Sequence, residues 1–183
     1  MKVSDLDILI APGHGGGSPD HWYARWVDKL STARRIEQAD WNEPNYDDWI
    51  AQIADHARKT ERPIVLVGHS LGALSIVHAA PLLADMGARA AFLVAPPSQR
   101  VLATMPEIDP RFSDIPSTPL PFPSVLVASR DDPYATYEES EAMARDWGST
   151  IADAGNAGHI NNESGHGPWP EGLMRFAGFL KTL

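Results

Sequence analysis

One pentapeptide, Gly68-His69-Ser70-Leu71-Gly72, constrains the fold of this chain more than any other stretch. It follows the apolar residues 64–67 and precedes a segment rich in alanine and leucine. This order predicts a buried strand, a sharp turn with a serine at its tip, and a helix. Glycines suit the two ends of the turn, because side chains there would collide with neighbouring backbone. The Ser70 hydroxyl should stand exposed as a nucleophile; the alternative is a glycine-rich strand–helix loop without chemistry.

The rest of the chain alternates short apolar runs with longer amphipathic ones, which predicts a parallel sheet covered by helices. Strands are expected at residues 7–11, 35–38, 63–68, 90–95, 124–128 and 150–153. Helices are expected at residues 18–30, 46–59, 71–87, 137–147 and 168–181. We therefore predict a single domain over residues 1–183. Its fold should be a three-layer α/β fold, with a mainly parallel central sheet of about six strands and helices on both faces.

Proline marks the places where these elements should begin or break. Ser18 and Pro19 suit a helix start, since serine caps helices and proline favours the first helical position. Pro81 should kink or split the helix after Ser70, because proline lacks the N–H that a helix interior needs. Between residues 96 and 123 proline is dense enough to exclude a long helix or an interior strand. That segment is expected to be a rigid connection or a short flap over the site.

Composition narrows the class of protein. The 183 residues include no cysteine, which excludes a thiol nucleophile, a disulfide framework and a cysteine-based zinc site. A formal net charge of -9 disfavours nucleic acid and anionic membranes as partners. Asp5 and Asp7 fall where a signal peptide would begin its apolar stretch, and no run approaches the roughly 18 apolar residues that span a bilayer. We therefore expect a cytoplasmic protein without a nucleic-acid or membrane partner.

A nucleophilic serine needs a base to take its proton and a third group to orient that base. In this architecture the partners follow in the order serine, acid, histidine. Asp131 and Asp132 follow the fifth expected strand, and His159 follows the sixth. Active sites of such sheets assemble beyond the carboxyl ends of the strands. His159 is therefore the expected general base toward Ser70, with His166 as its competitor, and the acid is one of the two aspartates.

Backbone N–H groups should stabilise the oxyanion that forms on an attacked carbonyl. The Leu71 N–H is one candidate, at the start of a helix whose dipole favours negative charge. The second candidate is the His14 N–H, in the glycine-rich loop at residues 12–17. The same loop permits a rival interpretation as the pyrophosphate loop of a dinucleotide-binding protein. That match is degenerate, since Ser18 stands where the third glycine would be.

Four motifs together resemble a known family. They are Pro12-Gly13-His14-Gly15-Gly16-Gly17, Gly68-His69-Ser70-Leu71-Gly72, Asp131-Asp132-Pro133-Tyr134 and Gly158-His159-Ile160-Asn161. The combination resembles the compact serine hydrolases of the retinoblastoma-binding protein nine family, a branch of the α/β-hydrolases, over nearly the whole chain. The resemblance implies a trimmed hydrolase sheet without a large cap domain. It also implies Ser70, Asp132 and His159 as the catalytic triad, which favours Asp132 over Asp131.

These observations predict a hydrolase of small-molecule acyl substrates, esters before amides, that forms an acyl-enzyme on Ser70. No metal and no cofactor is expected, since the chain has no cysteine and no H-E-x-x-H pattern. The small lid region predicts short or medium acyl groups. A non-catalytic binding protein on a hydrolase scaffold is the alternative, because a fold alone does not establish chemistry.

Overall fold

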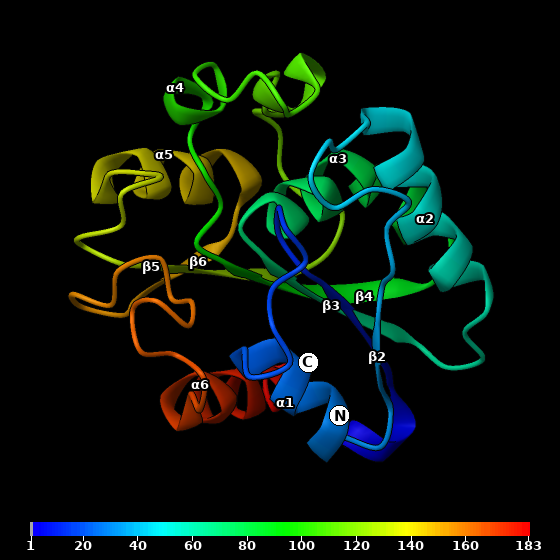
Figure 1. The fold of residues 1–183 in the computed structure, drawn as a ribbon. Coiled ribbons are helices and arrows are strands. Elements are labelled where there is room, and N and C mark those ends of the chain that lie inside the picture. Colours follow the sequence, from blue (N-terminus) through cyan, green and yellow to red (C-terminus); the bar gives the residue numbers. More distant parts are fainter. Residues whose placement is uncertain (1) are drawn as a thin grey trace.

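The computed structural model describes residues 2–183 and shows a parallel sheet between two layers of helices (Figure 1). The strands are β1 (Asp7–Ala11), β2 (Ala33–Arg35), β3 (Ile64–His69), β4 (Ala88–Val94), β5 (Ser124–Ala128) and β6 (Thr150–Asp153). They pair in the order β2-β1-β3-β4-β5-β6, and every neighbouring pair is parallel. The predicted three-layer fold with about six mainly parallel strands is confirmed.

Helices cover both faces of the sheet, with α1 and α6 on one side and α2, α3 and α5 on the other (Figure 1). The longer helices are α1 (Trp22–Lys29), α2 (Tyr46–Arg58), α3 (Leu71–Asp85), α5 (Tyr137–Trp147) and α6 (Pro170–Leu180). Three short ones are η1 (Val3–Asp5), α4 (Gln99–Leu102) and η2 (Pro110–Ser113). Two clusters of buried apolar side chains fill the spaces on either side of the sheet. Within residues 2–183 no large cap covers the fold, as the resemblance implied.

Local sequence accounts for most of these boundaries. All residues of β1 and β3 are buried, as expected for central parallel strands with helices on both faces. The Asn45 side chain caps α2 by accepting from the Asp48 N–H. Helix α5 begins with a reciprocal capping box between Thr136 and Glu139 and ends at Gly148 in the left-handed conformation.

Two predicted boundaries are wrong, and side-chain contacts explain both. Helix α1 begins at Trp22 and not at Ser18, because the Ser18 hydroxyl accepts from the Asn162 side chain instead of capping a helix. The second strand covers Ala33–Arg35 and not residues 35–38. Its pairing with β1 ends there, and the Arg35 guanidinium turns toward the glycine-rich loop, where it donates to the Gly16 carbonyl.

Pro81 does not split α3, which runs as one helix from Leu71 to Asp85. The ring lies on the exposed side of the helix, and buried residues on both sides of it, Val77 and Leu83 among them, keep the helix packed on the sheet. Burial of this apolar face offsets the missing backbone hydrogen bond. The prediction of a break near residue 80 is therefore wrong.

The proline-rich connection between β4 and β5 holds only the short helices α4 and η2, so the exclusion of a long helix and an interior strand is confirmed. The assignment of residues 1–183 to one domain stays a prediction. Within residues 2–183, no helix has both the length and the apolar character that a membrane crossing requires.

Candidate active site

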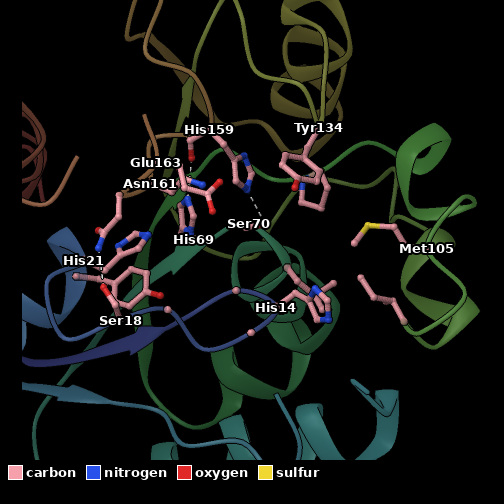
Figure 2. A pocket seen from close by; sticks show the side chains of 18 of the residues that line it. His14, Ser18, His21, His69, Ser70, Met105, Tyr134, His159, Asn161 and Glu163 are labelled. Carbon is pink, nitrogen blue, oxygen red and sulfur yellow. Dashed lines mark hydrogen bonds between the residues drawn. The ribbon is translucent and has the colours of Figure 1, made fainter. Parts of the chain in front are cut away.

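The structure brings Ser70, Asp132 and His159 together at the carboxyl edge of the sheet, beyond the ends of β3, β5 and β6. Ser70 Oγ lies 2.9 Å from His159 Nε2, the contact drawn as a dashed line in Figure 2. On the other side of the ring, His159 Nδ1 lies 3.0 and 3.1 Å from the two carboxylate oxygens of Asp132. The side chains of His159 and Asp132 are 8% and 3% exposed, so water barely weakens their interaction.

Steric constraint holds Ser70 in place. Its backbone adopts φ 54° and ψ -127°, a conformation that a residue with a side chain rarely takes. A Cβ on Gly72 would lie 2.2 Å from the Ala11 carbonyl oxygen, and one on Gly68 would lie 2.6 Å from the Ala73 Cα. Both glycines are therefore required by close approach of the backbone, as the sequence predicted.

Asp131 does not contact the ring of His159. Its Oδ1 accepts from the Gly158 N–H at 2.7 Å and from the Ser129 hydroxyl at 2.8 Å. The Ser129 oxygen in turn accepts from the Ala157 N–H at 2.9 Å. These hydrogen bonds, the one from Gly158 foremost, lower the pKa of the Asp131 carboxyl. Asp131 thus fastens the loop that carries His159, a role that its sequence position alone did not reveal.

His69 holds the backbone of His159 from the opposite side. Its Nε2 lies 2.9 Å from the His159 carbonyl oxygen, so this nitrogen carries the proton and donates. Burial, followed by the neighbouring charges of His159 and His21, lowers the pKa of His69 well below its usual value and keeps the ring neutral. Sequence reasoning missed this residue, although its place beside Ser70 in the sharp turn was a usable signal.

Two further contacts set the position of the catalytic candidates. The Trp22 indole N–H donates to the Ile160 carbonyl at 2.9 Å, which ties the histidine loop to α1. The Tyr134 ring lies 4.3 Å from the His159 ring, and its backbone N–H donates to Asp132 at 2.9 Å. His166, the competing base, meets the Ser164 hydroxyl at 3.1 Å, while His159 takes the place beside Ser70.

The two N–H groups predicted to face an oxyanion are both unused within residues 2–183. Leu71 is the first residue of α3, and the Ser70 N–H before it donates to the Val94 carbonyl at 2.9 Å. The loop that carries His14 passes directly over the serine, since a Cβ on Gly13 would lie 2.8 Å from the Ser70 Cβ. The His14 ring lines the cavity, with Nε2 3.0 Å from the Asn42 carbonyl oxygen. These positions suit donors to a group bound at Ser70.

A cavity of about 380 Å³ surrounds Ser70 and has two chemically different walls. We call one the polar arm; it is lined by Ser18, His21, His69, Asn161, Asn162 and Glu163. We call the other the apolar arm; it is lined by Pro97, Leu102, Met105, Ile108 and Tyr134. Figure 2 shows the two arms on opposite sides of Ser70. No lysine or arginine of residues 2–183 lines the cavity.

All residues of the apolar arm except Tyr134 belong to the proline-rich connection, which ion pairs fasten to α2. The Arg111 guanidinium lies 3.0 Å from the Asp47 carboxylate and 2.8 Å from the Asp109 carboxylate. Asp109 also accepts from the Tyr46 N–H, the first residue of α2. The hydrogen bond from Arg111 is the main reason that the pKa of Asp109 falls to about 2. The connection is therefore tied down at physiological pH.

The sequence model of a family described as serine hydrolase matches residues 8–178. A YdeN-like hydrolase from Pectobacterium atrosepticum is 31% identical, with a TM-score of 0.86 over 98% of this chain and 94% of that chain. No relative of curated function matches the chain in sequence.

More distant structures share the fold alone. The ydeN gene product of B. subtilis is 16% identical, with a TM-score of 0.77 over 97% of this chain and 99% of that one. Est1E from Butyrivibrio proteoclasticus, whose structure holds ferulic acid, is 16% identical with a TM-score of 0.66. That similarity covers 86% of this chain and 82% of Est1E.

Proposed function

The chain belongs to the serine hydrolase family, and from this premise we propose that it hydrolyses small esters, with amides as slower substrates, through an acyl-enzyme on Ser70. The observation that carries the proposal is the relay of contacts from Ser70 Oγ to His159 at 2.9 Å and on to Asp132 at 3.0 Å. The motif resemblance to the retinoblastoma-binding protein nine branch supports the same assignment. Membership of the serine hydrolase family makes hydrolysis the expected chemistry, and the residues of the site include a candidate for each group that acyl transfer needs.

In the first half-reaction, Ser70 Oγ attacks the carbonyl carbon of the ester while its proton passes to His159 Nε2. The electron pair of the carbonyl moves onto its oxygen, which accepts hydrogen bonds from the N–H groups of Leu71 and His14. Asp132 accepts from the Nδ1–H of His159, which keeps Nε2 free as the base and stabilises the imidazolium that forms.

Collapse of this intermediate breaks the bond between the carbonyl carbon and the alcohol oxygen. The alcohol leaves with the proton that His159 held, and the acyl group stays on Ser70. A water molecule then gives its proton to His159 and attacks the acyl carbon. The second collapse releases the carboxylic acid and returns the proton to Ser70 Oγ, so the enzyme is regenerated.

A fluorophosphonate probe tests the proposal, because it phosphonylates only an activated serine. We expect the wild-type protein to be labelled on Ser70, and the Ser70→Ala variant to remain unlabelled and to hydrolyse no p-nitrophenyl butanoate. Labelling that persists in Ser70→Ala would move the nucleophile elsewhere. An unlabelled, inactive but folded wild-type protein would favour the alternative, a binding protein on a hydrolase scaffold.

A further inference from the structure

The polar arm contains a buried imidazole that the proposed reaction does not use. His21 lines the cavity, is only 4% exposed, and stacks on the Tyr23 ring at 3.7 Å between centroids. Its Nδ1 is fully shielded and has no hydrogen-bond partner within residues 2–183. No residue of that range bonds to Nε2 either, so Nε2 is the nitrogen that a bound molecule can reach. Nδ1 is out of reach of a ligand, whereas Nε2 has no protein partner within residues 2–183 and can pair with a polar group bound in the cavity.

The charges of the polar arm define what that ligand can be. Burial is the main reason that the pKa of His21 falls to about 3, with smaller contributions from His159 and His166, so the ring stays neutral at physiological pH. A neutral imidazole offers one donor and one acceptor. The acidic residue of the polar arm is the exposed Glu163, and no lysine or arginine of residues 2–183 lines the cavity to pair with a carboxylate or phosphate. An anionic group would therefore meet repulsion here and no counter-charge.

The polar arm also borders the His159 ring, beside which a leaving group must depart. The proton of the departing alcohol comes from His159 Nε2, so the alcohol must lie beside that ring. The ring centroids of His21 and His69 lie 4.9 Å apart, and those of His69 and His159 also lie 4.9 Å apart. Residues 161–163 begin two positions after His159 and also line the arm.

We infer that the polar arm is a leaving-group subsite for an uncharged alcohol that carries a second, free hydroxyl group, and that His21 is the residue that selects this hydroxyl. The inference rests on the proposed function and names its substrate class: short-chain esters of diols or polyols. A hydroxyl both donates and accepts, so it pairs with either tautomer of His21. Asn161 and Asn162 add further donors and acceptors in the arm, and the acyl chain takes the apolar arm beside Met105.

Matched esters test this on the wild-type protein. 2-Hydroxyethyl butanoate and propyl butanoate have the same acyl group and nearly the same size, and differ in a terminal hydroxyl against a methyl. With rates normalised to hydroxide-catalysed hydrolysis, we expect kcat/KM to favour the hydroxyethyl ester by about tenfold or more. Carboxymethyl butanoate, whose leaving group is anionic, should be slower than both. Equal values for the first two esters, or a preference for the anionic one, would overturn the inference.

Variants assign the preference to His21. His21→Phe keeps a ring to stack on Tyr23 but has no nitrogen, so the hydroxyl preference should fall to about onefold. His21→Gln restores a donor and an acceptor and should recover much of the hydroxyl preference. If the phenylalanine variant folds poorly, the preference measured in His21→Gln still tests the role of His21. Met105→Leu, in the apolar arm, is the matched control and should retain the hydroxyl preference. A preference that survives in both His21 variants would exclude this residue as its source.

Fluorophosphonate labelling of the same preparations separates the two proposals. A protein that is labelled on Ser70 but does not distinguish the two butanoates refutes the subsite and leaves the hydrolase proposal standing. A folded protein that is not labelled refutes the hydrolase proposal itself, and with it the subsite.

Discussion

The two loops that meet at the candidate active site are held in place by different forces. The serine turn, residues 68–72, is fixed by close packing of backbone against backbone, with room for no side chain at Gly68 or Gly72. The histidine loop, residues 155–161, is fixed by hydrogen bonds from distant segments. Asp131, Trp22 and His69 each bond to a different backbone group of this loop.

This difference determines how each loop should respond to change. A steric constraint involves the turn and the strand ends beside it, so a single added methyl group disturbs the whole turn. A set of hydrogen bonds distributes the constraint, so the loss of one bond leaves the others in place. We therefore expect a single substitution in the serine turn to cause a large loss of stability or activity. Single substitutions in the histidine loop should cause smaller losses.

The largest contrast is expected between one glycine of each loop. Gly72→Ala places a methyl group 2.2 Å from the Ala11 carbonyl oxygen, so we expect a loss of more than about 3 kcal/mol of unfolding free energy, or no folded protein. Gly155→Ala meets no atom within 4 Å, and its φ of 71° should cost only about 1 kcal/mol. Urea unfolding, with fluorophosphonate labelling as a measure of the folded site, gives both values. Equal losses in the two variants would contradict the contrast.

The next largest contrast separates the two neighbouring aspartates. Asp132→Asn should lower kcat by about 10⁴-fold, the loss known for a protease triad, because the amide donates to Nδ1 and leaves the proton on the nitrogen that faces Ser70. Asp131→Ala removes an acceptor of the Gly158 N–H but leaves the triad contacts, so we expect a loss of about 10²-fold at most.

Steady-state hydrolysis of p-nitrophenyl butanoate by both variants gives these ratios, and circular dichroism confirms that each is folded. A larger loss in Asp131→Ala than in Asp132→Asn would reverse the assignment of the acid. If kcat fell by about 10⁴-fold in both variants, the histidine loop would be as sensitive to a single substitution as the serine turn.

The smallest effect is a difference in pH range between the two loops. His69 in the serine turn and His21 beside it have pKa values lowered mainly by burial, so below about pH 6.5 the unfolded chain binds protons that the folded chain does not. The free energy of unfolding should therefore decrease as the pH is lowered below this value, by up to about 1.4 kcal/mol per pH unit for each histidine. Asp131, with its lowered pKa, acts in the same direction but only below about pH 4, where the unfolded chain takes up its proton.

Urea unfolding between about pH 7 and about pH 5 isolates the contribution of the histidines. The slope of unfolding free energy against pH should be shallower in His21→Gln than in wild type, and unchanged in Asp131→Ala. A flat wild-type profile over this range would contradict the assignment of neutral, buried histidines.

Sequence reasoning succeeded where the cause was local. The glycines at both ends of the serine turn and the apolar core strands each follow from a few neighbouring positions. It failed where the partner lies far along the chain. Ser18 resembles a helix cap, but its hydroxyl is bound by Asn162, 144 residues away. The bond from Asp131 to Gly158 and the orphan nitrogen of His21 depend in the same way on tertiary contacts that no local pattern encodes.

The proline-rich connection between β4 and β5 supplies Leu102, Met105 and Ile108 to the apolar arm and contains none of the candidate reacting groups. Under the proposed function, the residues that contact the acyl chain and the residues that break the ester bond therefore belong to separate segments of the sequence. Recombination or loop grafting confined to residues 96–123 would replace these residues of the apolar arm and leave Ser70, Asp132 and His159 unchanged. If the proposed function holds, related proteins can differ in the acids they release while they keep the same three candidate catalytic residues.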